Sequence, residues 1–121
     1  MLAAARYGTR DLERAKTFYD AITKILGASR VLDKSNVIGY KKGDGMMFMI
    51  GMPFEGDATS GNGTMVSIPA PSREAVDQVH AKALELGGKC AGAPGVRGSG
   101  AYGAYIRDPD GNKLGFFHMA S

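Results

Sequence analysis

The stretch YGAYIRDPDGNKLGFFH, from Tyr102 to His118, decides the fold of this chain. Two apolar, aromatic-rich runs flank its central residues 108–112, DPDGN. Proline fixes one backbone angle, and glycine and asparagine tolerate a positive φ, so these five residues predict a tight connection between antiparallel strands. Residues 37–50 show the same pattern of strand, Asp-Gly turn and strand. The two hairpins indicate that the chain consists of two similar halves.

Each half is predicted to contain a strand, a helix and three further strands, from the spacing of apolar residues and from capping signals. The expected elements of the first half are a strand over 2–8, a helix over about 12–26 capped by Thr9 or Asp11, and strands over 30–32, 37–40 and 46–51. Those of the second half are a strand over 64–68, a helix from Ser72 to Gly87, a short strand over 89–91, a flexible loop over 92–101 and the final hairpin. We therefore expect one α+β domain, residues 1–121, with two βαβββ modules at about 1–52 and 64–121.

Composition excludes several classes of protein. Hydrophobic residues make up 44% of the chain and charged residues 22%, which is ordinary for a globular domain. No apolar run is long enough to span a membrane. The net charge is +3, and the basic residues form no stripe interleaved with aromatic residues, so no nucleic-acid partner is expected. A single cysteine, Cys90, excludes an internal disulfide and indicates a cytoplasmic location.

Three features together resemble the vicinal oxygen chelate superfamily. They are the segment DLERAKTFY at residues 11–19, the doubled βαβββ order and the segment RDPDGNKL at residues 107–114. That superfamily includes glyoxalase I, bleomycin resistance proteins, extradiol dioxygenases and fosfomycin resistance enzymes. The resemblance covers essentially the whole chain and implies a curved mixed sheet around a cavity, with helices on the outer face. It implies less about activity, because one fold hosts many chemistries.

The resemblance also implies where metal ligands would lie. The corresponding positions in this sequence are Ala4, Met49, Met65 and Gly115. Alanine and glycine have no donor atom and a thioether is a soft ligand, so none suits a hard or borderline divalent ion. His80 lies in the second predicted helix, and His118 differs in strand parity from Gly115, so neither replaces a missing ligand. We expect no bound metal and no cofactor.

Alternation along the strands, anchored at Gly115, predicts which side chains face the cavity. The residues expected to contact a ligand are Arg6, Met47, Met49, Met65, Ser67, Tyr105, Arg107, Gly115 and Phe117. Tyr105 lies three residues before Asp108, where the resembling fosfomycin enzymes keep a ligand-contacting tyrosine; alternatively, its ring packs at a strand end. Arg6 either binds an anionic group or extends to the rim.

The expected function is metal-free binding or sequestration of a small organic molecule in an apolar cavity, as in bleomycin resistance proteins. Methionines adapt to irregular ligands, although they also fill ordinary cores. Residues 46–50 are apolar on both faces, which predicts that a cavity, ligand or partner covers them and favours a homodimer. One alternative is a lactoylglutathione-lyase-like enzyme, or another lyase or isomerase of the superfamily, with metal ligands elsewhere. Another is a scaffold with a filled cavity.

Overall fold

A computed structural model describes residues 1–119. Its elements follow the order βαβββ twice. The first module contains β1 (Ala4–Gly8), α1 (Leu12–Leu26), β2 (Ser29–Asp33), β3 (Val37–Lys41) and β4 (Met47–Gly51). The second contains β5 (Val66–Pro69), α2 (Arg73–Glu85), β6 (Lys89–Val96), β7 (Tyr102–Arg107) and β8 (Lys113–His118). The predicted fold class and module order are confirmed, and residues 120–121 of the second module lie outside the described residues.

Both helices begin and end at residues that satisfy their free backbone groups. At the start of α1, the Asp11 side chain accepts a hydrogen bond from the backbone N–H of Arg14 at 3.1 Å. Gly27 ends that helix with a φ of 83°, a conformation that glycine adopts without strain. At the start of α2, the Ser72 hydroxyl oxygen accepts a hydrogen bond from the backbone N–H of Ala75 at 3.0 Å. Thr9, the other candidate cap of α1, has a different role described below.

The eight strands are divided equally between two mixed sheets. Their orders are β1-β4-β3-β2 and β5-β8-β7-β6. In each sheet the first strand of the module lies parallel to the last, and the remaining neighbours are antiparallel. The two sheets are therefore built in the same way, as the repeated hairpin pattern predicts.

One element is longer than predicted. The short strand expected over 89–91 extends to Val96, so the first half of the predicted loop over 92–101 is part of β6. Its pairing with β7 shifts register between Cys90 and Gly92 and again between Gly92 and Gly95. Bulges of this kind let a strand rich in glycine and proline remain paired although its spacing is irregular. The local sequence pattern therefore predicts the start of this strand but not its second half.

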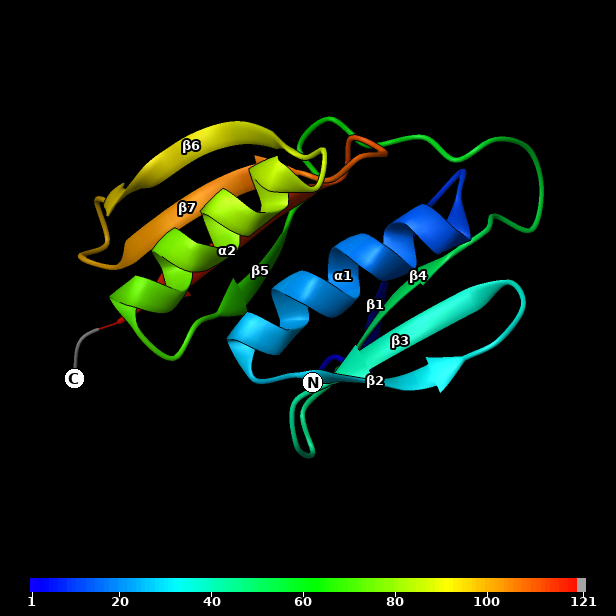
Figure 1. The fold of residues 1–121 in the computed structure, drawn as a ribbon, viewed down its shortest axis with the longest axis horizontal. Helices are drawn as coiled ribbons and strands as arrows, with labels where there is room; N and C mark the ends of the chain where they lie inside the picture. The colour runs from blue at the N-terminus through cyan, green and yellow to red at the C-terminus, as the bar shows by residue number, and fades with distance from the viewer. Residues whose placement is uncertain (120–121) are drawn as a thin grey trace.

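The helices form one layer on one side of both sheets. Figure 1 shows α1 and α2 side by side, and the two helices are in direct contact. The apolar core lies between this layer and the sheets. Its largest fully buried side chains include Tyr19, Tyr40, Phe18, Phe116, Ile22 and Leu26. Within residues 1–119, neither helix is long and apolar enough to cross a membrane.

The DPDGN turn between β7 and β8 fastens the second module to the first. The Asp108 carboxylate is buried and accepts hydrogen bonds from the Tyr19 hydroxyl of α1 at 2.6 Å and from the Asn112 backbone at 2.9 Å. Burial raises the pKa of Asp108 in spite of these bonds. The side-chain amide of Asn112 in turn donates to the carbonyl of Gly8 at 2.9 Å. The Tyr19 hydroxyl, the Asp108 carboxylate and the Asn112 amide are thus all hydrogen-bonded in this contact.

Asp110 makes the second part of the same contact. Its carboxylate accepts hydrogen bonds from the Thr9 hydroxyl at 2.5 Å, from the Arg10 backbone at 3.0 Å and from the Arg14 guanidinium at 2.9 Å. Burial alone would raise the pKa of Asp110, but the hydrogen bonds from Thr9 and Arg10 and the charge of Arg14 outweigh it and lower that pKa. The stretch that decides the fold therefore also joins the modules.

We predict that Asp110→Asn reduces the free energy of unfolding at pH 7 by about 1–3 kcal/mol, because it weakens hydrogen bonds to a charged acceptor. The folded-state pKa of Asp110 lies below its usual 3.8, so this stabilisation is present above about pH 4 and is lost as the pH falls through the lowered value. Urea melts of wild type and variant should therefore converge under strongly acidic conditions. Asp44→Asn, in the exposed β3–β4 turn, is the control with the same change of charge. Equal stability of wild type and Asp110→Asn at pH 7 would contradict the prediction.

Candidate functional site

Alternation along the strands separates side chains that face the helices from those that face away. On β8, Leu114 and Phe116 are buried in the core, which leaves Lys113, Gly115 and Phe117 on the opposite side. The side of each sheet that faces away from the helices is called its open face below. Because the helices contact each other, both open faces point away from one common helical layer (Figure 1).

The nine residues predicted to contact a ligand divide between the two modules. The first sheet carries Arg6, Met47 and Met49 on its open face, and the second carries Ser67, Tyr105, Arg107, Gly115 and Phe117. Met65 lies one residue before β5, and the residue is 44% exposed. The structure therefore assembles two groups rather than one, and the ligand-binding role of these residues stays a prediction.

Arg6 lies at the edge of the first open face. One of its guanidinium nitrogens donates to the Met52 carbonyl at 2.9 Å, and the guanidinium covers Gly51, where a side chain would collide with it. It borders a hollow that is otherwise formed by the first module and the linker, including Pro53 and Asp57. This arrangement favours the interpretation of Arg6 as a rim residue.

Tyr105 occupies the centre of the second open face. Its register partners on the two neighbouring strands are Gly92 and Gly115. A Cβ added at Gly115 would lie 3.0 Å from Cε1 of the Tyr105 ring, and one added at Gly92 would lie 2.8 Å from Cδ2. The ring lies across the sheet because both neighbours lack a side chain. Gly115 therefore lies beneath the edge of the ring and also borders the hollow described next.

Two cations lie against this ring. The Arg97 guanidinium carbon and the Lys113 ammonium nitrogen are each 5.2 Å from the centroid of the Tyr105 ring, within the range of cation–π attraction. The sequence pattern does not reveal Arg97, because residues 92–101 predict a flexible loop. The bulges of β6 set its position, and no local pattern marks them.

A hollow of about 230 Å³ adjoins the ring. Its lining combines cationic, hydroxyl and apolar side chains, among them Arg97, Ser67, Ser99, Phe117 and Met119. Binding sites for small molecules have this character, with few polar groups in an otherwise apolar concavity. The second open face therefore has the features of a ligand site within a single chain.

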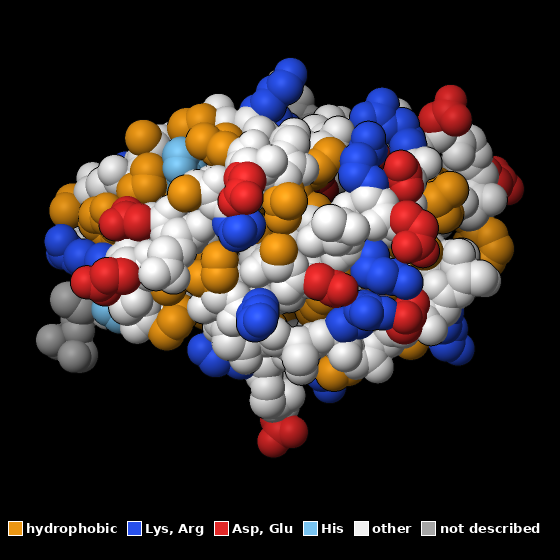
Figure 2. Space-filling view, viewed as in Figure 1, with side chains coloured by type: hydrophobic (Ala, Val, Ile, Leu, Met, Phe, Trp, Pro, Cys, Tyr) orange, Lys and Arg blue, Asp and Glu red, His pale blue; other side chains and the backbone are white. Residues whose placement is uncertain are grey.

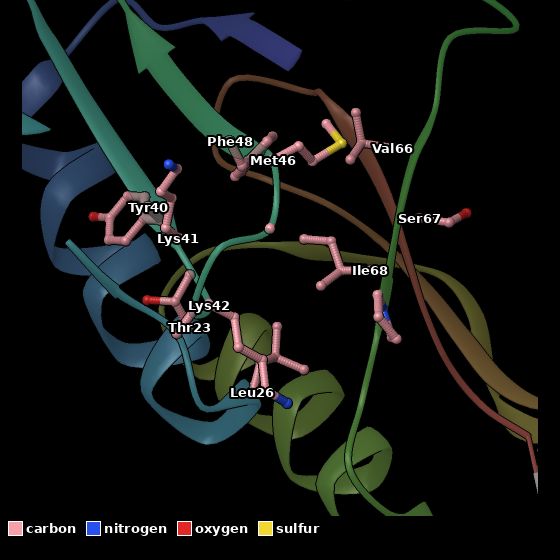
Figure 3. A pocket seen from close by; sticks show the side chains of 13 residues that line it. Thr23, Leu26, Tyr40, Lys41, Lys42, Met46, Phe48, Val66, Ser67 and Ile68 are labelled. Carbon is pink, nitrogen blue, oxygen red and sulfur yellow. The ribbon is translucent and has the colours of Figure 1, made fainter. Parts of the chain in front are cut away.

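A more apolar hollow of about 310 Å³ lies between the modules (Figure 3). Ile68 points toward it and Ser67 points away, while the first module contributes Leu26, Tyr40 and Phe48. Burial and a hydrogen bond to Asp20 raise the pKa of Tyr40, so its hydroxyl stays protonated at neutral pH. The sequence did not predict this hollow because it depends on how the modules pack.

Known proteins share this arrangement of modules. A family model described as the Glyoxalase/Bleomycin resistance protein/Dioxygenase superfamily matches residues 2–116. The chain belongs to this superfamily. It is 35% identical to a glyoxalase/bleomycin resistance protein from Albidiferax ferrireducens T118, with a TM-score of 0.92 over 99% of both chains.

Two solved structures with lower identity show the same fold. One is a lactoylglutathione lyase from Agrobacterium tumefaciens, 20% identical, with a TM-score of 0.69 over 98% of this chain and 92% of that chain. The other is a bleomycin-binding protein complexed with bleomycin, 15% identical, with a TM-score of 0.65 over 99% and 98%. Among curated proteins, none matches the chain.

The four metal-ligand positions that the superfamily resemblance implies do not fit a divalent metal. Gly115 lies beneath the Tyr105 ring, Met65 precedes its strand, and neither Ala4 nor Met49 offers an oxygen or nitrogen donor. Elsewhere in residues 1–119, no three His, Cys, Asp or Glu side chains are grouped so that they could hold a metal ion.

The two histidines lie outside both open-face groups. His118 Nδ1 is 3.1 Å from the Ala70 carbonyl oxygen, which accounts for one of its ring nitrogens. His80 on α2 has its Nε2 at 3.2 Å from Sγ of Cys90 on β6. Burial lowers the pKa of His80. Neither histidine contacts the hollow beside Tyr105.

We predict that Gly115→Leu reduces the free energy of unfolding by about 1–3 kcal/mol, because the new side chain needs the space of the Tyr105 ring. Chemical denaturation measures the change. Gly98→Leu is the matched control, because nothing lies within 4 Å of a Cβ at that position. In a Tyr105→Ala background the cost of Gly115→Leu should shrink, since the ring is gone. An equal cost with and without the ring would show that Tyr105 does not cover Gly115.

Proposed function

We propose that this superfamily member binds a small organic molecule on the open faces of its sheets and holds it without a metal ion. The observation that carries the proposal is the second open face, where the half-buried Tyr105 ring rests on two glycines beside a hollow of about 230 Å³. Binding needs such a concavity and a few oriented polar groups, and it needs no hard metal donor. Sequestration of the ligand is the mechanism that these side chains support.

A second candidate function is that of a metal-dependent lyase or isomerase. The shared fold with lactoylglutathione lyase from Agrobacterium tumefaciens favours it. The donor set weighs against it, because Ala4, Met49, Met65 and Gly115 stand where the superfamily resemblance implies metal ligands. Metal content and metal-independent ligand binding separate the two candidates.

We predict that the purified, untagged chain contains well under one equivalent of Zn, Ni, Mn, Fe or Co. EDTA should leave its melting temperature unchanged, because no metal binding is coupled to folding. In a thermal-shift screen with EDTA present, ligands should still raise the melting temperature, and Tyr105→Ala should abolish those shifts. Stoichiometric metal together with loss of binding in EDTA would support the lyase or isomerase instead.

We also propose that the chain forms a homodimer. Apolar side chains on or beside the open faces stay partly exposed in one chain, including Met46 at 39% and Met65 at 44%. A two-fold axis would place the first open face of one copy against the second open face of the other, which forms two equal cavities. Such a pairing would bring Arg6, Met47 and Met49 close to the Tyr105 group of the partner.

Light scattering at micromolar concentration should therefore give a mass of about twice 12.7 kDa. Met49→Lys should shift the protein toward monomer without unfolding it, because it places a charge in the proposed interface. Val31→Lys adds the same charge at an exposed position of β2 and should leave the dimer intact. A 12.7 kDa wild-type species at high concentration would refute the homodimer.

We further propose a cytoplasmic location. The sequence contains one cysteine, Cys90, which is exposed and forms no disulfide. A reducing compartment keeps an exposed thiol of this kind in the free state.

A further inference from the structure

In the described part of the chain, Lys and Arg side chains around α1 form salt bridges, whereas those on the second open face do not. Around α1, Figure 2 shows Lys and Arg side chains next to Asp and Glu side chains, and the salt bridges there include Arg14 with Asp110 and Lys16 with Asp33. By contrast, Arg97, Arg107 and Lys113 on the second open face take part in no salt bridge among residues 1–119. Two of these three cations, Arg97 and Lys113, lie against one ring, that of Tyr105.

Two of the three cations occupy neighbouring positions, and the third shares an aromatic ring with one of them. Arg107 and Lys113 are direct partners in the β7–β8 register and lie on the same face. Like charges opposite each other on a sheet are unfavourable unless something negative lies between them or beside them. Lys113 and Arg97 approach the Tyr105 ring at the same distance, 5.2 Å to the centroid. The face therefore concentrates positive charge around one aromatic platform.

Two of these cations are held in place while donors remain for a ligand. A guanidinium nitrogen of Arg97 donates to the Ala93 carbonyl at 2.6 Å, and one of Arg107 donates to the Gly111 carbonyl at 2.6 Å. A guanidinium has five N–H donors, so each arginine keeps several that these contacts do not use. Orientation by the backbone reduces the entropy that a ligand contact would cost.

The adjoining hollow has matching chemistry. No Asp or Glu is among the residues that line it, and the hydroxyls of Ser67 and Ser99 add further donors. Phe117 and Met119 supply an apolar wall. A cationic ligand would meet only positive charge here, and an inorganic anion would leave the apolar wall without a contact. An acidic group attached to a small apolar body satisfies both parts.

We propose that the second open face binds a small organic acid, with its carboxylate or phosphonate held by Arg97, which lines the hollow, and attracted by the charge of Lys113 at the same ring, and with its apolar part against Phe117. This inference rests on the proposed function, because it specifies the ligand class of the same site. Tyr105 serves as the platform that holds both cations beside the acidic group. Arg107 reinforces the positive potential from the neighbouring strand position.

Calorimetry on the full chain with matched aromatic probes tests the inference. Phenylphosphonate and benzoate should bind at least about tenfold more tightly than benzamide and benzylamine, because hydrogen bonds to a charged acceptor are stronger than neutral ones. Inorganic phosphate should bind about tenfold more weakly than phenylphosphonate, because it has no apolar part to bury. Raising the salt concentration should weaken the binding of both acids.

Charge variants assign the effect to the two cations. Arg97→Gln and Lys113→Gln should each weaken phenylphosphonate binding by about tenfold or more. Lys34→Gln removes the same charge at an exposed position between β2 and β3, so it should change binding by less than about twofold. Lys113→Glu should lower the affinity for benzoate and raise it for benzylamine. Thermal melts of every variant establish that it is folded.

Several results would overturn the inference. Benzamide binding as tightly as the acids, absence of binding by either acid, or equal losses in Lys34→Gln and Lys113→Gln would each do so. If benzamide binds and Tyr105→Ala abolishes that binding while the acids fail to bind, the ligand cavity stands and only the acid assignment falls. If Tyr105→Ala affects no probe that binds, the proposed function falls as well.

Discussion

The hydrogen bond between the Tyr19 hydroxyl and the buried Asp108 carboxylate is the constraint on which the rest of the structure depends. A buried carboxylate is costly unless it is hydrogen-bonded, and Asp108 has partners from α1 and from its own turn. Burial, and then the nearby Asp108, raise the pKa of Tyr19 well above its usual value, so the donor keeps its proton. Because the two groups come from different modules, satisfying both requires the modules to dock in one way.

The docking of the two modules determines which faces of the sheets remain uncovered. Because α1 and α2 pack against each other, the apolar sides of both helices and the helix-facing sides of both sheets are buried in one core. The open faces are left on the outside, and each carries its own group of side chains. The proposed homodimer would enclose both faces, and the exposed methionines beside them support that proposal.

Several parts of the site were predictable from the residues. The period of two along β4, β7 and β8 places Met47, Tyr105 and Phe117 away from the helices, because alternation is a local property of extended backbone. The unsuitability of Met49 and Gly115 as metal ligands is likewise a matter of their atoms alone. Arg97 and the hollow between the modules were missed, since bulged pairing and module docking leave no periodic signal.

The sequence by itself determined the order of the modules, the hairpin turns, the helix caps and the side of each strand on which a residue lies. These follow from backbone preferences over a few residues. Only the tertiary structure decided that Tyr105 lies over Gly115 and Gly92, and that Arg97 and Lys113 meet at its ring. Those contacts join strands whose residues are separated in the chain, and side-chain packing across a sheet depends on the space that such neighbours leave empty.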